Sequence, residues 1–199
     1  MNTWNTEVDY DAVLANHCLH HVVKLESLFA QVKRCLSATN GLFLVADMIG
    51  RNGHQLWPET LIEVRKFWRE LPPGKRLDRA TGCIEPEFVN YDCSKVGFEG
   101  IRAQDILPLL VDHFEFEMFL PQCSFVTALI ERRTGWNFNV EDPTDLDFVD
   151  RLEAHEQSLM KNLNVKPTQM LAAMRLRANT PRVLLAPQFT PQACIRWKD

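Results

Sequence analysis

The chain has 199 residues, the size of one ordinary domain, and 46% of them are hydrophobic, which is too many for a disordered protein. Its 26 acidic and 22 basic residues disfavour nucleic acid as a partner, because nucleic-acid-binding domains usually carry a basic face. The sequence shows no apolar run of the roughly 20 residues that cross a bilayer and no signal peptide, so we expect a cytoplasmic protein without a membrane partner, whose six cysteines are reduced thiols.

A strand, a helix and a second strand are predicted near the start of the chain. Residues 8–15 form the first strand, and the continuous apolar run 12–15 is typical of a strand covered on both faces. Apolar residues at helical spacing predict a helix over 24–36, and Gly41 lies just past its end. Residues 42–46 form a second buried strand, which Asp47 follows.

Residues 50–100 are less regular and are interpreted as a helical insertion. A helix is predicted over 58–71, because proline is favoured at a first helical position and Pro58 stands there. The loop before this helix carries a dense set of polar and aromatic side chains, namely Arg51, Asn52, His54 and Trp57.

The second half of the chain predicts a helix over 103–114, a strand over 116–120, a short helix within 123–133, a helix over 146–163 and a last strand over 168–176. Thr144 and Asp147 have the spacing of a capping box for the fourth of these elements. Glu153, Glu156 and Lys161 are interpreted as its solvated face. The order of elements predicts one α/β domain over 1–177, with a sheet of about four strands and an insertion at about 50–100, followed by a tail over 178–199.

Several segments resemble class I S-adenosylmethionine-dependent methyltransferases. Tyr10-Asp11-Ala12-Val13, Leu19-His20-His21, the helix end before Gly41, and Leu44-Val45-Ala46-Asp47 follow the family pattern D-x-V, L-H-H, L-K-P-G-G and D. Here Ser37-Ala38-Thr39-Asn40-Gly41 stands where Lys-Pro-Gly-Gly is usual. Residues 47–54, 57–59 and 97–101 resemble a narrower bacterial subgroup. The resemblance covers roughly residues 8–176.

The resemblance implies a partial Rossmann-like sheet, with strands equivalent to 4-5-7-6 of the family order 3-2-1-4-5-7-6. It also implies S-adenosyl-L-methionine as cofactor, with Asn16 and Leu19 on the cofactor side. The sequence contains no G-x-G-x-G turn, which is the family's cofactor-binding element, and the first three strands are absent. We therefore interpret the chain as an N-terminally truncated, methyltransferase-like protein.

The missing strands have a physical consequence. Without its usual neighbour, the strand over 8–15 is an apolar edge that favours pairing with another chain. We expect it to be covered by a second copy in a homo-oligomer, by a separate chain that supplies the cofactor half, or by the N-terminal segment folding back.

The predicted site lies where the two N-terminal strands end, since the carboxyl ends of parallel strands carry the chemistry in open α/β sheets. His20 and His21 are the candidate catalytic residues, because an imidazole can accept a proton from a methyl acceptor near neutral pH. The candidate residues for binding a small-molecule acceptor are Asn16, His17, Asp47, Arg51, Asn52, His54 and Trp57.

Each of these residues also has a purely structural interpretation. His20 and His21 can fill the turn and cap the next helix, Asp47 can be a turn residue, and Arg51 and Trp57 can pin the loop. A third interpretation is a zinc site built from His17, His20 and His21 with Asp47 or His54, although the spacing matches no common zinc motif. Two functions thus stand side by side: a methyltransferase acting on a small molecule, and a non-catalytic remnant that serves as a binding or assembly module.

Overall fold

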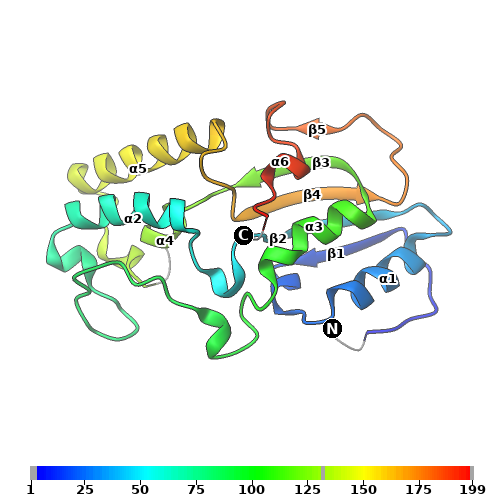
Figure 1. Cartoon of the computed structure of the whole chain (residues 1–199), viewed down its shortest axis with the longest axis horizontal. Helices are drawn as coiled ribbons and strands as arrows, with labels where there is room; N and C mark the ends of the chain where they lie inside the picture. The colour runs from blue at the N-terminus through cyan, green and yellow to red at the C-terminus, as the bar shows by residue number, and fades with distance from the viewer. Residues whose placement is uncertain (1–3, 131–132, 198–199) are drawn as a thin grey trace. The chain divides into compact units, whose positions relative to one another are not determined.

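The computed structural model describes residues 4–130 and 133–197, which group into two units (Figure 1). The first unit contains residues 4–55, 92–122 and 166–197, and the second contains Leu56–Tyr91 and the described part of Cys123–Val165. Residues 131 and 132, at the end of the predicted short helix, lie outside the described residues. The described helices include none with the length and apolarity that a membrane crossing requires.

A mixed five-stranded sheet forms the centre of the first unit. Its strands are β1 (Ala12–Asn16), β2 (Leu42–Met48), β3 (Glu115–Gln122), β4 (Gln169–Arg175) and β5 (Val183–Leu184), in the order β1-β2-β4-β3-β5. β1 is parallel to β2, β4 is antiparallel to both β2 and β3, and β5 is parallel to β3. The predicted α/β class is confirmed, with β5 as a strand beyond the expected four.

Helices α1 (Leu25–Leu36), α3 (Ala103–His113) and α6 (Pro191–Cys194) complete this unit (Figure 1). α1 contacts β1, β2 and α3, and α6 contacts α3 and β3. The side chains of Phe29, Phe43, Leu110 and Phe119 have no exposed surface. The ring centroids of Phe29 and Phe43 are 6.2 Å apart, so the apolar face of α1 packs directly on β2. This core fixes where β1 and β2 end, and therefore where the candidate site lies.

β1 differs from the predicted strand in both length and burial. It begins at Ala12 rather than residue 8, and Ala15 is its one buried residue. Leu14 is 69% exposed, which contradicts a strand covered on both faces. The physical reason is its place in the sheet: among the described residues β1 pairs only with β2, and the sheet face that carries Leu14 is open there. The described residues 4–11 form no strand that could cover this edge.

The second unit is helical. It contains α2 (Pro58–Glu70), α4 (Val126–Ile130) and α5 (Pro143–Lys161). α4 contacts both α2 and α5. The ring centroids of Phe67 and Phe148 are 5.8 Å apart, so α2 and α5 also share a core.

The start of α5 and one of its faces differ from the prediction. The residue that caps α5 is Asp142, whose carboxylate accepts the Thr144 N–H at 2.9 Å, so the predicted capping box of Thr144 and Asp147 is wrong. Glu156 is 5% exposed and belongs to the buried face, because its carboxylate accepts main-chain N–H groups at the start of α4. Glu153 and Lys161 are exposed, as predicted.

Candidate functional site

The chain turns sharply where β1 ends. His17 has a left-handed backbone conformation (φ 46°), and its N–H donates to the carbonyl of Ala46 on β2 at 2.8 Å. The 3₁₀ helix η1 (Leu19–His21) follows at once. This turn places consecutive side chains in different environments. His17 is exposed, Leu19 and His20 are buried, and His21 is half-buried.

Asp47, on β2, organises this turn through both of its carboxylate oxygens. Oδ2 accepts the N–H groups of Cys18 and Leu19 at 2.8 and 2.7 Å. Oδ1 accepts the N–H of Met48 at 2.8 Å and lies 2.5 Å from Nδ1 of His20. Asp47 and His20 are 1% and 4% exposed, so this is a buried acid–imidazole pair. Because the Asp47 carboxylate accepts a hydrogen bond at Nδ1, it favours the His20 tautomer whose proton is on Nδ1. This tautomer leaves a lone pair on Nε2.

The electrostatic setting keeps Asp47 ionised. Burial would raise the pKa of its carboxyl, but the hydrogen bonds from His20, Leu19 and Cys18 outweigh burial and hold the pKa below its ordinary value. The same charge acts on the neighbouring thiol: burial first, and then the negative Asp47, raise the pKa of Cys18. Cys18 therefore stays protonated near neutral pH and does not offer a thiolate nucleophile.

A loop from a distant part of the sequence brings a second carboxylate to the turn. Two main-chain hydrogen bonds hold this loop, from the Gly53 N–H to the Gly100 carbonyl at 2.8 Å and from the Ile101 N–H to the His20 carbonyl at 3.0 Å. Gly100 has φ +63°, and a Cβ on it would lie 2.9 Å from the backbone nitrogen of His54. The close approach of the two backbones places Glu99 beside the histidines.

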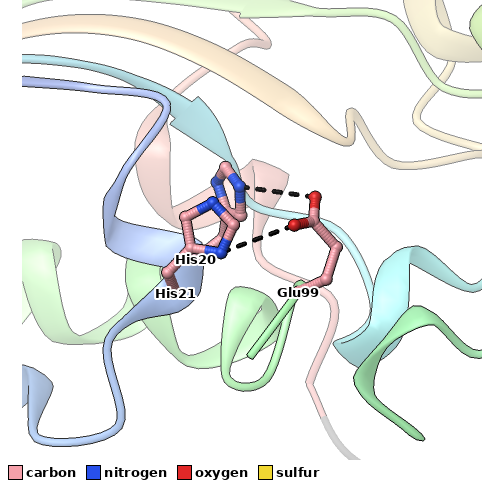
Figure 2. A group of neighbouring side chains, drawn as sticks. All are labelled: His20, His21 and Glu99. Atoms are coloured by element: carbon pink, nitrogen blue, oxygen red, sulfur yellow. Dashed lines mark ion pairs between the residues drawn. The ribbon is translucent and has the colours of Figure 1, made fainter. Parts of the chain in front are cut away.

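The carboxylate of Glu99 faces three imidazole rings. Oε1 lies 3.7 Å from Nε2 of His20 and 3.3 Å from Nε2 of His54, and Oε2 lies 3.5 Å from Nδ1 of His21. Figure 2 shows His20 and His21 with their rings turned toward Glu99. Nδ1 of His21 also lies 3.1 Å from the carbonyl oxygen of Phe98. The ring of His54 is 5.1 Å from that of His20, so the histidines form one compact group around a single acid.

The other predicted residues of the loop after β2 make structural contacts. The main-chain N–H of Asn52 donates to the side-chain oxygen of Gln104, and the N–H of Gln104 donates to the side-chain oxygen of Asn52, both at 3.2 Å. Asn52 thereby ties this loop to the start of α3. Arg51 lies near Asp92, whose pKa is lowered first by the Ser94 hydroxyl and more weakly by Arg51.

The remaining predicted residues divide between surface, core and the second unit. Asn16 and His17 are exposed, and the His17 ring centroid is 6.5 Å from that of His20. The side chain of Leu19 lies in the core with 1% exposure. Trp57 belongs to the second unit, where it is buried directly before α2. The structure thus brings together His20, His21, Asp47 and His54, and it sets His17 at the margin of this group.

Glu99 is the site residue that sequence reasoning missed. It lies 78 positions after His21, and no periodic pattern connects its loop to the first strand. Two signals were available: residues 97–101 belong to a segment of the family resemblance, and Gly100 permits a close approach to another backbone. Gln104 was missed for the same reason.

The described residues do not fit the whole of S-adenosylmethionine. The N–H of Leu19 is already accepted by Asp47, and its side chain is in the core, so Leu19 offers no surface to a cofactor. Asn16 alone remains on that side of the turn, and no glycine-rich turn accompanies it within residues 4–130 and 133–197. Comparisons with protein-family models, with curated proteins and with solved structures find no match.

Proposed function

We propose that this chain is the acceptor-side part of an S-adenosylmethionine-dependent methyltransferase that acts on a small molecule. The observation that carries the proposal is the buried His20–Asp47 pair, which joins the end of β1 to the end of β2. In open α/β sheets, the carboxyl ends of parallel strands are the usual place for chemistry. β1 and β2 are parallel, and both end at this turn.

The order of the strands supports the same proposal. β1, β2, β4 and β3 are neighbours in this order, which is the order 4-5-7-6 that the family resemblance implies. The cofactor would be held by a segment outside the described residues, because these residues do not fit it. We therefore assign this chain to the acceptor side alone.

His20 is the proposed proton acceptor. Asp47 holds its Nδ1, so that Nε2 offers the lone pair on the side where Glu99, His21 and His54 gather. An acceptor hydroxyl, amine or activated carbon placed there would lose its proton to Nε2, and the negative Asp47 would stabilise the imidazolium that forms. Asn16 and His17, exposed on the same turn, are proposed to contact the acceptor.

The partner proposal follows from the edge strand. The outer edge of β1 has no paired strand among the described residues, and an apolar edge of this kind favours strand pairing with another chain. We propose that a second copy of the chain covers it, so that the protein is a homo-oligomer.

Calorimetry and a labelling assay test the function together. The protein is titrated with S-adenosylmethionine, and methyl-labelled cofactor is then supplied with a pool of small-molecule acceptors. If the assembled protein supplies the rest of the cofactor site, the titration gives measurable heat and the assay gives labelled product. His20→Gln should lower the rate roughly 10²- to 10⁴-fold, the usual contribution of a general base.

The matched control is His113→Gln, in the last turn of α3 and outside the cluster, which should keep the wild-type rate. A second candidate function is a non-catalytic module that retains the acceptor half, and the absence of a cofactor fit in the described residues favours it. Neither heat nor labelled product from the wild-type protein would overturn the enzyme and leave this module. An unchanged rate in His20→Gln would overturn the role of His20.

A further inference from the structure

We propose that His20, His21 and Glu99 form a binding site for a divalent transition-metal ion of the zinc class. Nitrogen and oxygen atoms of these three side chains lie within 4.8 Å of one another. Two imidazoles and one carboxylate are a ligand set that zinc uses in proteins, with further coordination positions left for water or substrate. The proposal goes beyond methyl transfer and does not depend on it.

One ligand atom from each side chain lies within 4.8 Å of the other two, so small side-chain rotations would let all three reach one ion. Ligand atoms that lie about 2.0–2.2 Å from a tetrahedral zinc are roughly 3.3–3.6 Å from one another. Nε2 of His20 is 3.7 Å from one oxygen of Glu99, and Nδ1 of His21 is 3.5 Å from the other. Both separations are longer than typical hydrogen bonds, and because they end on different oxygens of Glu99, a shared ion would be bound after one of these oxygens turns toward both rings. Figure 2 shows the carboxylate of Glu99 facing both rings, with dashed lines along these two separations.

Two further residues hold the ligands in place from behind. Asp47 lies 2.5 Å from Nδ1 of His20, on the opposite side of the ring from the proposed metal. A metal-binding histidine commonly donates its other N–H to a carboxylate in this way, which fixes the ring and strengthens the ligand. His54 places its Nε2 3.3 Å from an oxygen of Glu99 and so orients that carboxylate. Two of the three proposed ligands, His20 and Glu99, thus have a supporting residue.

The choice of ion follows from the ligands. Imidazole nitrogen favours zinc, copper, nickel and iron, whereas magnesium and calcium favour sites made of oxygen. Metal binding through Nδ1 of His21 requires the ring tautomer that carries its proton on Nε2, and it would replace the 3.1 Å contact of Nδ1 with the Phe98 carbonyl. We therefore commit to Zn²⁺ as the ion and to Mg²⁺ as the ion that fails to bind.

Not every histidine of this turn belongs to the proposed metal site. His17, in the same turn, is exposed, and its ring centroid is 6.5 Å from that of His20. It does not belong to the group whose ligand atoms converge.

A bound ion would also occupy Nε2 of His20, the atom proposed as proton acceptor. A metal and a proton therefore compete for one lone pair, and the loaded protein cannot use His20 as a base.

The test is calorimetric titration of the metal-free, full-length protein with ZnCl₂, together with the visible absorption of Co²⁺ added to the same protein. We expect one ion per chain, a tetrahedral Co²⁺ spectrum, and no heat with MgCl₂. His20→Gln and Glu99→Gln should each lower the Zn²⁺ affinity at least 100-fold. Asp47→Asn, which weakens the support of His20 and of the turn that carries it, should lower the affinity about 10- to 100-fold.

His17→Asn is the matched control, because asparagine tolerates the left-handed backbone of this position, and it should keep the wild-type affinity. Circular dichroism of each variant establishes that the fold is retained. If a variant unfolds, the Co²⁺ spectrum of the wild-type protein decides the question alone. An unchanged affinity in Glu99→Gln, equal binding of Mg²⁺, or an octahedral Co²⁺ spectrum in the wild-type protein would overturn the proposal. None of these outcomes depends on whether methyl transfer is observed.

Discussion

The carboxylate of Asp47 serves the fold and the proposed chemistry with the same two oxygens. One oxygen accepts the N–H groups of Cys18 and Leu19, which begin the turn after β1. The other accepts from Met48 and lies against Nδ1 of His20. Buried N–H groups need a partner, so replacing this acid would disturb the backbone and the histidine together. The structural and functional interpretations of Asp47 are therefore compatible.

Asp47→Asn should destabilise the protein by about 2–4 kcal/mol, because the amide places an NH₂ group against donors and removes a charge that several hydrogen bonds share. The measurement is urea unfolding at pH 7. The control is Asp9→Asn, an exposed acid that lies 3.4 Å from Arg34, and it should change stability by no more than about 0.5 kcal/mol. Equal stability of the Asp47 variant and the wild type would contradict the role given to this carboxylate.

The same carboxyl predicts a dependence on pH. Its pKa is lower in the folded protein than its ordinary value of 3.8, so its contribution to stability is complete above that value and is lost as pH falls through the folded pKa. The stability difference between wild type and Asp47→Asn should therefore shrink as the pH falls below 3.8. Unfolding curves of both proteins across this range provide the measurement. A difference that grows in acid would contradict the sign.

At this scale the sequence predicts the residues that follow a strand, and no more. The sequence could identify His20, His21 and Asp47 as site residues because they stand at strand ends, where side chains of neighbouring strands meet. The sequence could not place Glu99 in the site, because its position depends on two hydrogen bonds between segments that are far apart in the chain. Leu19 was assigned to the cofactor by resemblance, whereas its apolar side chain is in the core.

The loop that carries Glu99 is an element without regular structure, and one glycine decides whether it can approach the histidines. Gly100 has φ +63°, and any Cβ there would meet the backbone of His54 and Gly53 at 2.9 and 3.1 Å. Gly97, in the same loop, has nothing within 4 Å of the position of a Cβ. The two glycines therefore form a natural pair for mutation.

Gly100→Ala should destabilise the protein by about 1–2 kcal/mol or more, since alanine is strained in the left-handed region and must also displace its neighbours. Because the loop would move away from the turn, the Zn²⁺ affinity should fall at least 10-fold. Gly97→Ala should leave stability within about 0.5 kcal/mol and leave the affinity unchanged. Thermal unfolding and zinc titration of the two variants provide the comparison. Equal behaviour of both variants would show that the backbone contact does not position Glu99.

In the second unit, Glu156 has a structural role that the helical pattern of the sequence does not indicate. Its Oε2 accepts the consecutive N–H groups of Ser124, Phe125 and Val126, which lead into α4. Glu156→Gln should lower stability by about 1–3 kcal/mol, because a neutral amide binds these donors more weakly than a carboxylate. Glu153→Gln, on the exposed face of the same helix, should have almost no effect. Denaturant unfolding distinguishes the two, and equal losses would contradict the cap.

The sequence predicts a helix or strand well where the buried residues of that element follow a regular apolar spacing. α1, α2 and β2 follow from apolar spacing and from Gly41 and Pro58, and their observed bounds lie within two residues of the prediction. Burial of Glu156 was not predictable, since a carboxylate on a helix is usually solvated unless a distant backbone needs it. β5 was missed because a strand of two residues carries no pattern of its own.

At the scale of the whole molecule, the sheet of the first unit leaves one strand and part of one face open. Leu14 on β1 is 69% exposed, and Leu171 on β4 is 38% exposed. The pairing of Leu14 with Leu44, and of Ala46 with Leu171, places both side chains on the same face of the sheet. An edge strand with an exposed leucine is a site for association, because it offers both backbone hydrogen bonds and apolar surface.

We therefore expect the purified protein to self-associate through β1. Light scattering across a range of concentrations should show a mass above that of the monomer, and Leu14→Lys should return the protein to the monomer, because a charged side chain on an edge strand opposes pairing. Val140→Lys is the control, since Val140 is 75% exposed in a loop of the second unit and should not affect association. Hydrogen exchange adds a second measurement, because a paired edge slows exchange of the amides of residues 12–16 as concentration rises. A monomer at every concentration, with fast exchange in these residues, would contradict the proposed homo-oligomer without affecting the zinc site, whose ligands all lie within one chain.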